Sequence, residues 1–414
     1  MTELNQIVQN QEYDDQIARE YEEIIKDGSL EIGDWFTGYQ EVPTNLKFIE
    51  KLNIQTLRLY INSNMSVKLQ SRTIKELTLR LSENTEEQVL NLKVDDLELE
   101  SLEVMNIDRN NLQNDQLYNL SKFKKLQTLN VSWNQVDLTH IHIVTSLTKL
   151  FMCCCDLMNI NQITPLTNLE VLNVSSNKLK NINSICNLVN LKELNIRCNS
   201  QLDITPLHSL VSLIKLDLGF CGLSQLSALK PLINLQNLDL SNNFNINITV
   251  LQYLKNLTHL NLNNCNIVSI CVLRPLVNLK ELSIACDKIV YLDANLNQMK
   301  KLEKLRVNDN FVRDFTSIEK HRNYNNINEE SRRCFNISDQ KEPSKQILHY
   351  ANKLRNIESP NIQLKEIQSK RKTLKTALDN CKQEVNAVLK NANHIQFTSS
   401  AAELFQQLSH AVSQ

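Results

Sequence analysis

Apolar side chains recur along the middle of the chain in a fixed phrase, L-x-x-L-x-L-x-x followed by Asn, Cys or Asp. Successive copies begin 22 residues apart, at Leu147, Leu169, Leu191, Leu213, Leu235, Leu257 and Leu279. At the centre of each phrase apolar and polar residues alternate, which predicts a short strand with one buried and one exposed face. Connecting segments such as ITPLTNL and LKPLINL contain proline, which suits short 3₁₀ or extended crossings better than long helices.

This period and consensus are typical of the leucine-rich repeat, in which the strands of successive coils form one parallel sheet. We therefore expect an α/β leucine-rich-repeat solenoid with a concave parallel sheet and a convex side of 3₁₀ or short helical segments. The slot that ends each phrase holds Asn in most copies and Cys at Cys155, Cys221 and Cys265. Because that side chain lies inside the turn after the strand, we expect these three thiols to be structural and reduced.

Three parts are predicted along the chain. Residues 1–45 form an N-terminal helical cap, in which DDQIAREYEEIIKD predicts a helix that ends at Gly28. Residues 46–324 form the solenoid, which is irregular to about 101, regular over 102–310 and closed by a turn to 324. Residues 325–414 form a C-terminal helical extension.

The irregular stretch leaves one question of register open. Its phrases IQTLRLY and IKELTLR begin 20 residues apart, whereas those at Val94 and Leu102 begin only eight residues apart. One of these last two is therefore not a full repeat.

The helical extension carries a weak coiled-coil signal. Its apolar stripe from Leu374 to Val388 spans about two heptads, short of the three or four that indicate a coiled coil. Packing against the end of the solenoid is the favoured interpretation.

Charge and hydropathy exclude several classes of partner. Lys and Arg number 45 against 46 Asp and Glu, so the net charge of −1 does not favour nucleic acid or an anionic membrane. No apolar run reaches the roughly 18 residues of a membrane span. The start, MTELNQIVQNQEYDDQ, is polar and acidic rather than a signal peptide. We expect a cytoplasmic protein, and the nucleus or a cilium is compatible with the same features.

Signals of catalysis, cofactors and metals are missing. The five glycines form neither G-x-x-x-x-G-K nor G-x-G-x-x-G, and there is no H-E-x-x-H or paired C-x-x-C. The run from Cys153 to Cys155 resembles a metal cluster, but neighbouring strand residues point to opposite faces, so no metal site is expected. We predict a protein that is not an enzyme and holds no cofactor.

Candidate binding residues stand out on the predicted concave face, where most outward positions are Asn, Asp or Ser. Large or charged exceptions are Trp133, Phe151, Arg197 and Phe220, and Asp217 and Asp239 form an acidic patch beside them. Aromatic and Arg side chains are enriched in binding hot spots. We hypothesise that these residues bind a partner protein. The alternatives are a solvated Asn and Asp ladder along the sheet, and aromatics that are shielded by the terminal segments or by neighbouring concave side chains.

The 22-residue period, with KLKNINSI and then P-L-x-N-L after the consensus, resembles the short intracellular class of leucine-rich repeats. That class includes the leucine-rich-repeat regulatory subunit of type-1 protein phosphatase and an axonemal dynein light chain. The resemblance implies a concave face rich in acidic and aromatic residues, as at Trp133, Phe151, Asp217 and Asp239. We therefore predict a non-catalytic scaffold or adaptor that binds a partner protein on its concave face. The alternative is a phosphatase regulatory subunit or a ciliary or cytoskeletal assembly component.

Overall fold

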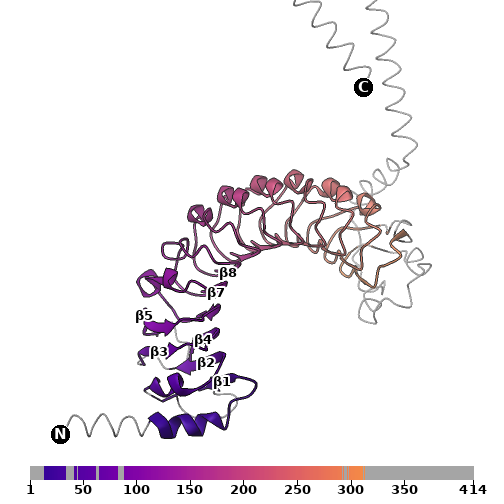
Figure 1. Cartoon of the computed structure of the whole chain (residues 1–414). Coiled ribbons are helices and arrows are strands. Elements are labelled where there is room, and N and C mark those ends of the chain that lie inside the picture. Colours follow the sequence, from indigo (N-terminus) through magenta and orange to yellow (C-terminus); the bar gives the residue numbers. More distant parts are fainter. Residues whose placement is uncertain are drawn as a thin grey trace, which may run out of the picture. The chain divides into compact units, whose positions relative to one another are not determined.

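The computed structural model describes residues 14–33, 42–43, 45–61, 65–82, 88–290, 292, 296, 298–310 and 312. Within them, thirteen strands form a single sheet, and every neighbouring pair is parallel. The strands line the inner side of the solenoid and short 3₁₀ helices line its outer side (Figure 1). The predicted leucine-rich-repeat solenoid is confirmed.

The order along this main sheet follows the chain. Its strands are β1 (Ser29–Ile32), β2 (Thr56–Ile61), β4 (Glu76–Leu81), β6 (Val104–Asn106), β7 (Thr128–Asn130), β8 (Lys149–Phe151), β9 (Val171–Asn173), β10 (Glu193–Asn195), β11 (Lys215–Asp217), β12 (Asn237–Asp239), β13 (His259–Asn261), β14 (Glu281–Ser283) and β15 (Lys304–Arg306). The 3₁₀ helices are η1 (Lys47–Lys51), η2 (Asn114–Leu117), η3 (Leu120–Lys122), η4 (Asn161–Ile163), η5 (Asn183–Asn187), η6 (Thr205–Ser209), η7 (Ser227–Leu229), η8 (Ile248–Tyr253) and η9 (Cys271–Leu273).

The repeated leucines form one continuous core between the sheet and the 3₁₀ helices. In the coil of β9, Leu169, Leu172 and Val174 are all buried, as their counterparts are in the other regular coils. Residues 22 apart pair in register, for example Leu172 with Leu194. Each coil therefore contacts its two neighbours through the same positions, as in other repeat proteins.

A left-handed residue turns the chain out of each regular strand. It stands three residues after the last strand residue and has a φ of +54° to +60°. This row consists of Arg109, Trp133, Cys154, Ser176, Cys198, Phe220, Asn242, Asn264, Cys286 and Asp309. None of them is glycine, although side chains disfavour this region by roughly 1–2 kcal/mol. Their backbone N–H groups continue the inter-coil hydrogen bonding, as Trp133 N does to Cys153 O at 2.8 Å.

A buried side chain closes each of these turns from the slot that ends the repeat phrase. In the coil of β12, Asn243 Oδ1 accepts hydrogen bonds from the N–H groups of Cys221 (3.2 Å) and Leu223 (2.9 Å). Its Nδ2 donates to the carbonyl oxygens of Leu218 (2.9 Å) and Leu240 (2.8 Å). One amide thus satisfies four backbone groups in two coils, groups that would be costly to bury unpaired.

The cysteines of this slot are buried, as predicted, and they act as donors. The thiols of Cys155, Cys221 and Cys265 donate to carbonyl oxygens of the preceding coil at 3.2 to 3.5 Å. Burial raises their pKa values to about 12, 11 and 12 respectively. A neutral thiol therefore replaces the donating Nδ2 group of the asparagine, but it does not replace the accepting Oδ1 atom.

A second asparagine row, which the repeat pattern did not suggest, lies on the exposed turn that leads into the strands. Each amide donates across to a carbonyl of the preceding coil at 2.9 to 3.0 Å. The row consists of Asn168, Asn190, Asn234, Asn256 and Asn278. Because these amides are exposed, they contribute less than the buried ladder.

The irregular part is built differently from the regular coils. The phrase at Leu102 continues the main sheet as β6, whereas the phrase at Val94 belongs to β5 (Leu92–Leu99). Strand β5 pairs with β3 (Val67–Ser71), in a two-stranded sheet separate from the main one. The Val94 phrase is therefore the one that is not a repeat of the main sheet.

The N-terminal stretch 1–45, predicted as a helical cap, contains a helix over residues 14–22 and also β1, the first strand of the main sheet. The prediction that this helix runs on to Gly28 is wrong, because a turn follows residue 22 and Lys26 already pairs with Ser29. The predicted closing turn, the extension over 325–414 and its coiled-coil stripe lie outside the described residues. In the part of the chain that the structure describes, no helix has the length and apolarity to cross a membrane.

One coil departs from the ladder by carrying a carboxyl group. Asp287 Oδ1 accepts from Cys265 N (2.8 Å) and Ile267 N (3.0 Å), but its buried Oδ2 finds no hydrogen-bond partner among the described atoms. At this place an asparagine would donate to two carbonyl oxygens, by analogy those of Leu262 and Ile284. Burial raises the pKa of Asp287 to about 7, because the neutral form avoids a buried charge and can act as a donor.

Asn243→Ala removes two acceptor and two donor contacts inside the core. We expect the free energy of unfolding to fall by about 3 kcal/mol or more, because several buried backbone groups lose their partners. Urea unfolding measures this loss. Asn234→Ala is the matched control, since its exposed amide makes a single inter-coil bond, and we expect it to cost less than about 1 kcal/mol. Equal losses in the two variants would contradict this account of the buried ladder.

Asp287→Asn should stabilise the protein above pH 7 and remove part of its pH dependence. The pKa of Asp287 is higher in the folded chain, about 7, than its ordinary 3.8. The stability that protonated Asp287 contributes is therefore fully present below about pH 4 and is lost as the pH rises through about 7. That rise in pKa corresponds to about 4 kcal/mol. Urea midpoints of wild type and variant at pH 5 and pH 8 test this, and parallel pH profiles would contradict it.

Candidate functional site

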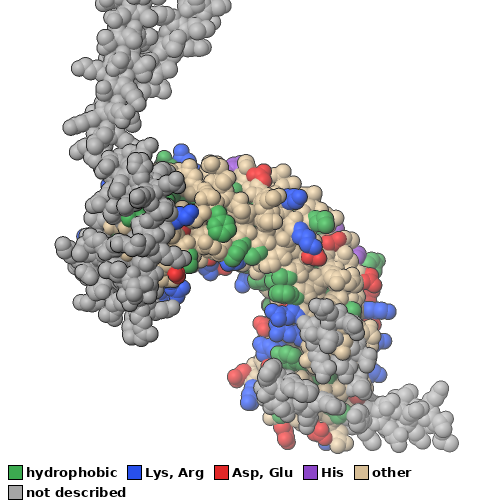
Figure 2. Space-filling view, turned by 180° about the vertical axis from the view of Figure 1, so that it is seen from behind, with side chains coloured by type: hydrophobic (Ala, Val, Ile, Leu, Met, Phe, Trp, Pro, Cys, Tyr) green, Lys and Arg blue, Asp and Glu red, His purple; other side chains and the backbone are tan. Residues whose placement is uncertain are grey.

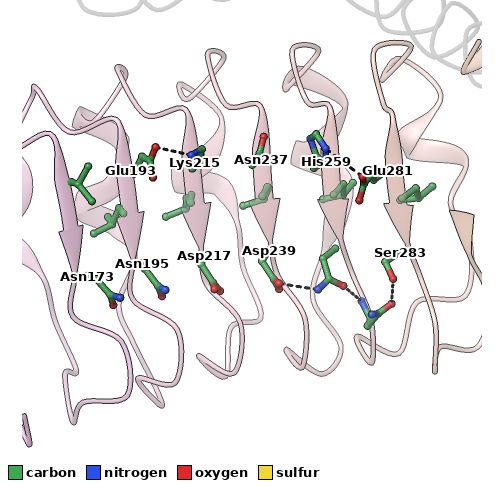
Figure 3. A pocket seen from close by; sticks show the side chains of 18 of the residues that line it. Asn173, Glu193, Asn195, Lys215, Asp217, Asn237, Asp239, His259, Glu281 and Ser283 are labelled. Carbon is green, nitrogen blue, oxygen red and sulfur yellow. Dashed lines mark hydrogen bonds and ion pairs between the residues drawn. The ribbon is translucent and has the colours of Figure 1, made fainter. Parts of the chain in front are cut away.

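The exposed face of the main sheet forms a shallow groove of about 490 Å³ across the coils of β8 to β15. Its floor consists of the outward side chains of the strands, because side chains alternate along a strand. Asn173, Asn195, Asp217 and Asp239 all project to the same side of the sheet (Figure 3). The predicted outward column is therefore confirmed as one row of polar groups.

Most of this polar column bonds within its own coil rather than along the sheet. Asn173 Oδ1 accepts from Ser175 N at 3.0 Å, and Asn195 Oδ1 accepts from Arg197 N at 3.0 Å. Such side-chain bonds to the backbone two residues on are typical of Asn and Asp at turns. The column thus caps the turns after the strands. Among its members a cross-coil bond joins Asn261 Nδ2 to Asp239 Oδ2 at 2.8 Å.

A second outward column, two residues earlier in each regular strand, carries charged side chains of both signs between β10 and β15 and was not predicted from the sequence. Lys215 Nζ lies 2.7 Å from Glu193 Oε1, and His259 Nε2 lies 3.7 Å from Glu281 Oε1. Both pairs appear at the upper end of the strands in Figure 3. The period-two alternation of a strand places this column on the same face, because its residues precede the first buried residue of each strand by one position. The prediction considered only the outward positions that follow that buried residue.

Four of the six predicted binding residues form one cluster in the centre of this face. The Arg197 guanidinium lies 3.7 Å from Asp217 Oδ1 and 3.7 Å from Asp239 Oδ2. It also lies over the ring of Phe220, 4.8 Å from the ring centroid. Its Nη1 donates to Ser241 Oγ at 3.2 Å, two coils away along the sheet. One arginine therefore connects three successive coils.

A glycine makes this reach possible. A Cβ atom on Gly219 would lie only 2.2 Å from Arg197 Nη1. The coil between Arg197 and Ser241 therefore needs a residue without a side chain at this outward position.

The two carboxylates of the cluster are held by backbone donors as well as by Arg197. Asp217 Oδ1 accepts from Gly219 N at 2.9 Å, and Asp239 Oδ1 accepts from Ser241 N at 2.8 Å. Burial, together with the charge of Asp239, raises the pKa of Asp217, while Gly219 N–H and Arg197 oppose that rise. Two carboxyl groups thus share one guanidinium group.

Trp133 lies apart from this cluster, in a second pair of an arginine and an aromatic ring. The Arg109 guanidinium lies 5.0 Å from the centre of the Trp133 ring. Trp133 remains 50% exposed and Phe220 47% exposed. On the face seen in Figure 2, exposed hydrophobic side chains follow one another along the inner side of the solenoid, with basic side chains beside them.

Phe151 is the sixth predicted residue, and it lies at the β8 end of the groove. Its side chain is partly buried and pairs in register with Asn173. The structure therefore brings together Arg197, Asp217, Phe220 and Asp239. Phe151 and Trp133 lie outside this cluster.

The cysteine run does not gather into a metal site. Cys155 is buried in the ladder, whereas Cys153 is on the sheet face and Cys154 occupies the left-handed turn position. Across the described ranges, no group of three or more His, Cys, Asp or Glu side chains is arranged to hold a metal ion.

No protein-family model matches the chain, and no curated protein matches it in sequence. Among solved structures, it is similar to a leucine-rich-repeat protein of Leptospira interrogans, with a TM-score of 0.54 and 23% identity over 72% of this chain and 91% of that one. It is also similar to an internalin of Listeria monocytogenes, with a TM-score of 0.52 and 21% identity over 66% of this chain and 77% of that one. These likenesses show the fold: the chain is built as a leucine-rich-repeat solenoid.

Proposed function

We propose that this chain is a non-catalytic scaffold or adaptor that binds a partner protein on the concave face of its sheet. The observation that carries the proposal is the half-exposure of Trp133 and Phe220, each with an arginine over its ring, in the turns that follow β7 and β11. The few residues that carry most of the binding free energy of a protein interface are enriched in Trp, Tyr and Arg.

The backbone at these two residues supports the same role, because hydrogen bonds to the next coil hold it in place. Trp133 and Phe220 lie in the left-handed turn position, and their backbone N–H groups donate to the next coil at 2.8 and 2.9 Å. Residues that are already ordered lose little conformational entropy when a partner binds. The row of strands beside them provides the extended surface that a standard interface of about 800 Å² per partner requires.

Two finer predictions remain part of this proposal. The partner is a phosphatase or a cytoskeletal protein, as the resemblance of the repeat phrases implies. The site of action is intracellular, in the cytoplasm, the nucleus or a cilium. Support for a reducing compartment comes from the buried thiols of Cys155, Cys221 and Cys265, whose hydrogen bonds to backbone carbonyls require the reduced form.

Trp133→Asn/Phe220→Asn should abolish capture of the partner without loss of stability. Asn occupies the same left-handed position at Asn242 and Asn264, so the backbone tolerates the change. Affinity capture from the source cells with chemical crosslinking, followed by mass spectrometry, measures binding. Urea unfolding of the same variant checks that the fold is intact.

Tyr253→Ala is the matched control. Tyr253 is 47% exposed and has Lys230 Nζ 4.9 Å from its ring centre, but it belongs to η8 on the outer side. We expect it to keep the partner at the wild-type level. A stoichiometric partner that both variants retain, with crosslinks outside the concave face, would contradict the proposed surface.

A further inference from the structure

We propose that the edge of the sheet between Trp133 and Phe220 is a bipolar site for an extended segment of a partner protein. The segment carries an acidic residue at the Trp133 end and a basic residue, about six positions away, at the Phe220 end. This inference deepens the proposed function and rests on it for the class of partner.

At the Trp133 end, two guanidinium groups share one carboxylate. Arg80 binds Asp108 through two hydrogen bonds, Nε to Oδ1 at 3.0 Å and Nη2 to Oδ2 at 3.1 Å. Arg109 Nε lies 3.8 Å from the same Asp108 Oδ2. Arg80, Arg109 and Asp108 together therefore carry one positive charge in excess, and the Arg109 guanidinium that lies over Trp133 is the group without a carboxylate of its own.

At the Phe220 end the balance is reversed. Asp217 and Asp239 share the single guanidinium of Arg197, at 3.7 Å from each. The charged side chains of the neighbouring column offset each other, since Lys215 lies 2.7 Å from Glu193. Arg197, Asp217 and Asp239 together therefore carry one negative charge in excess. The two ends thus combine the same aromatic stacking with opposite net charges.

Small side chains separate the two ends. The left-handed positions of the three coils between them are Cys154, Ser176 and Cys198. A segment that lies along this row contacts an aromatic ring at each end and only small side chains between them. Large side chains at these three positions would block that path.

Spacing decides the length of the segment. Trp133 and Phe220 are four coils apart, which at about 4.8 Å per strand is roughly 19 Å. An extended chain rises about 3.3 Å per residue, so about six residues span this distance. Because side chains of an extended chain alternate, an even separation places the acidic and the basic side chain on the same side, facing the solenoid. The charge asymmetry also sets the direction in which the segment lies.

A random dodecapeptide display library is the probe, with the full chain as bait at low salt. We expect enriched peptides to carry Asp or Glu about six positions from Lys or Arg, with apolar residues beside each. Arg109→Asn and Asp217→Asn/Asp239→Asn should each weaken a selected peptide about fivefold, the effect of losing an exposed ion pair. Asn is compatible with the left-handed turn at position 109, and it caps the turn at position 195 as Asp217 and Asp239 do in their coils.

Charge reversal distinguishes the bipolar site from nonspecific peptide binding. Arg109→Glu should prefer a peptide whose acidic residue is replaced by Lys, and the Tyr253→Ala variant should bind the selected peptides as wild type does. Enriched peptides without the paired charges, or equal binding by the charge variants, would overturn the bipolar site. Those outcomes leave the proposed function standing if a partner is still captured through Trp133 and Phe220.

Discussion

The structure depends on hydrogen bonding between coils at the turn that ends each strand. Strands of only three residues make few ladder bonds, so the backbone groups of the turn must be satisfied by other means. Asn243 and its equivalents do this with a single amide that reaches two coils. Where Cys221 replaces asparagine, the thiol supplies only a donor. Asp287 supplies only acceptors when ionised, which explains its unpartnered oxygen and raised pKa.

The same turn also sets where function is placed. The buried ladder holds the residue before it in a left-handed conformation, with its side chain at the edge of the sheet. That position is free of packing requirements, because its hydrogen bonds come from the backbone. Residues as different as Asn242, Ser176 and Phe220 occupy it in different coils. Variation there changes the surface without changing the fold, and the two exposed aromatics result from this freedom.

On the concave face, charged side chains of different coils form ion pairs with one another. The Arg197 guanidinium contacts groups that stand 20 to 44 residues away in sequence, because coils 22 residues apart lie side by side. Gly219 leaves the space that this requires. Such sharing leaves an excess positive charge in the Arg80, Arg109 and Asp108 cluster at the Trp133 end and an excess negative charge in the Arg197, Asp217 and Asp239 cluster at the Phe220 end.

The solenoid, the 22-residue coils, the buried cysteines and the outward position of the polar column could all be predicted from the sequence. Each depends on a local periodicity that repeats in every coil, so no long-range contact was needed to see it. Only the folded chain shows that Val94 belongs to the small sheet with β3 and that Trp133 stands apart from Phe220. It also shows that Arg197 reaches over Gly219 to Asp217 and Asp239. These facts depend on which rotamer a long side chain adopts and which coil it reaches, and the packing of neighbouring coils settles both.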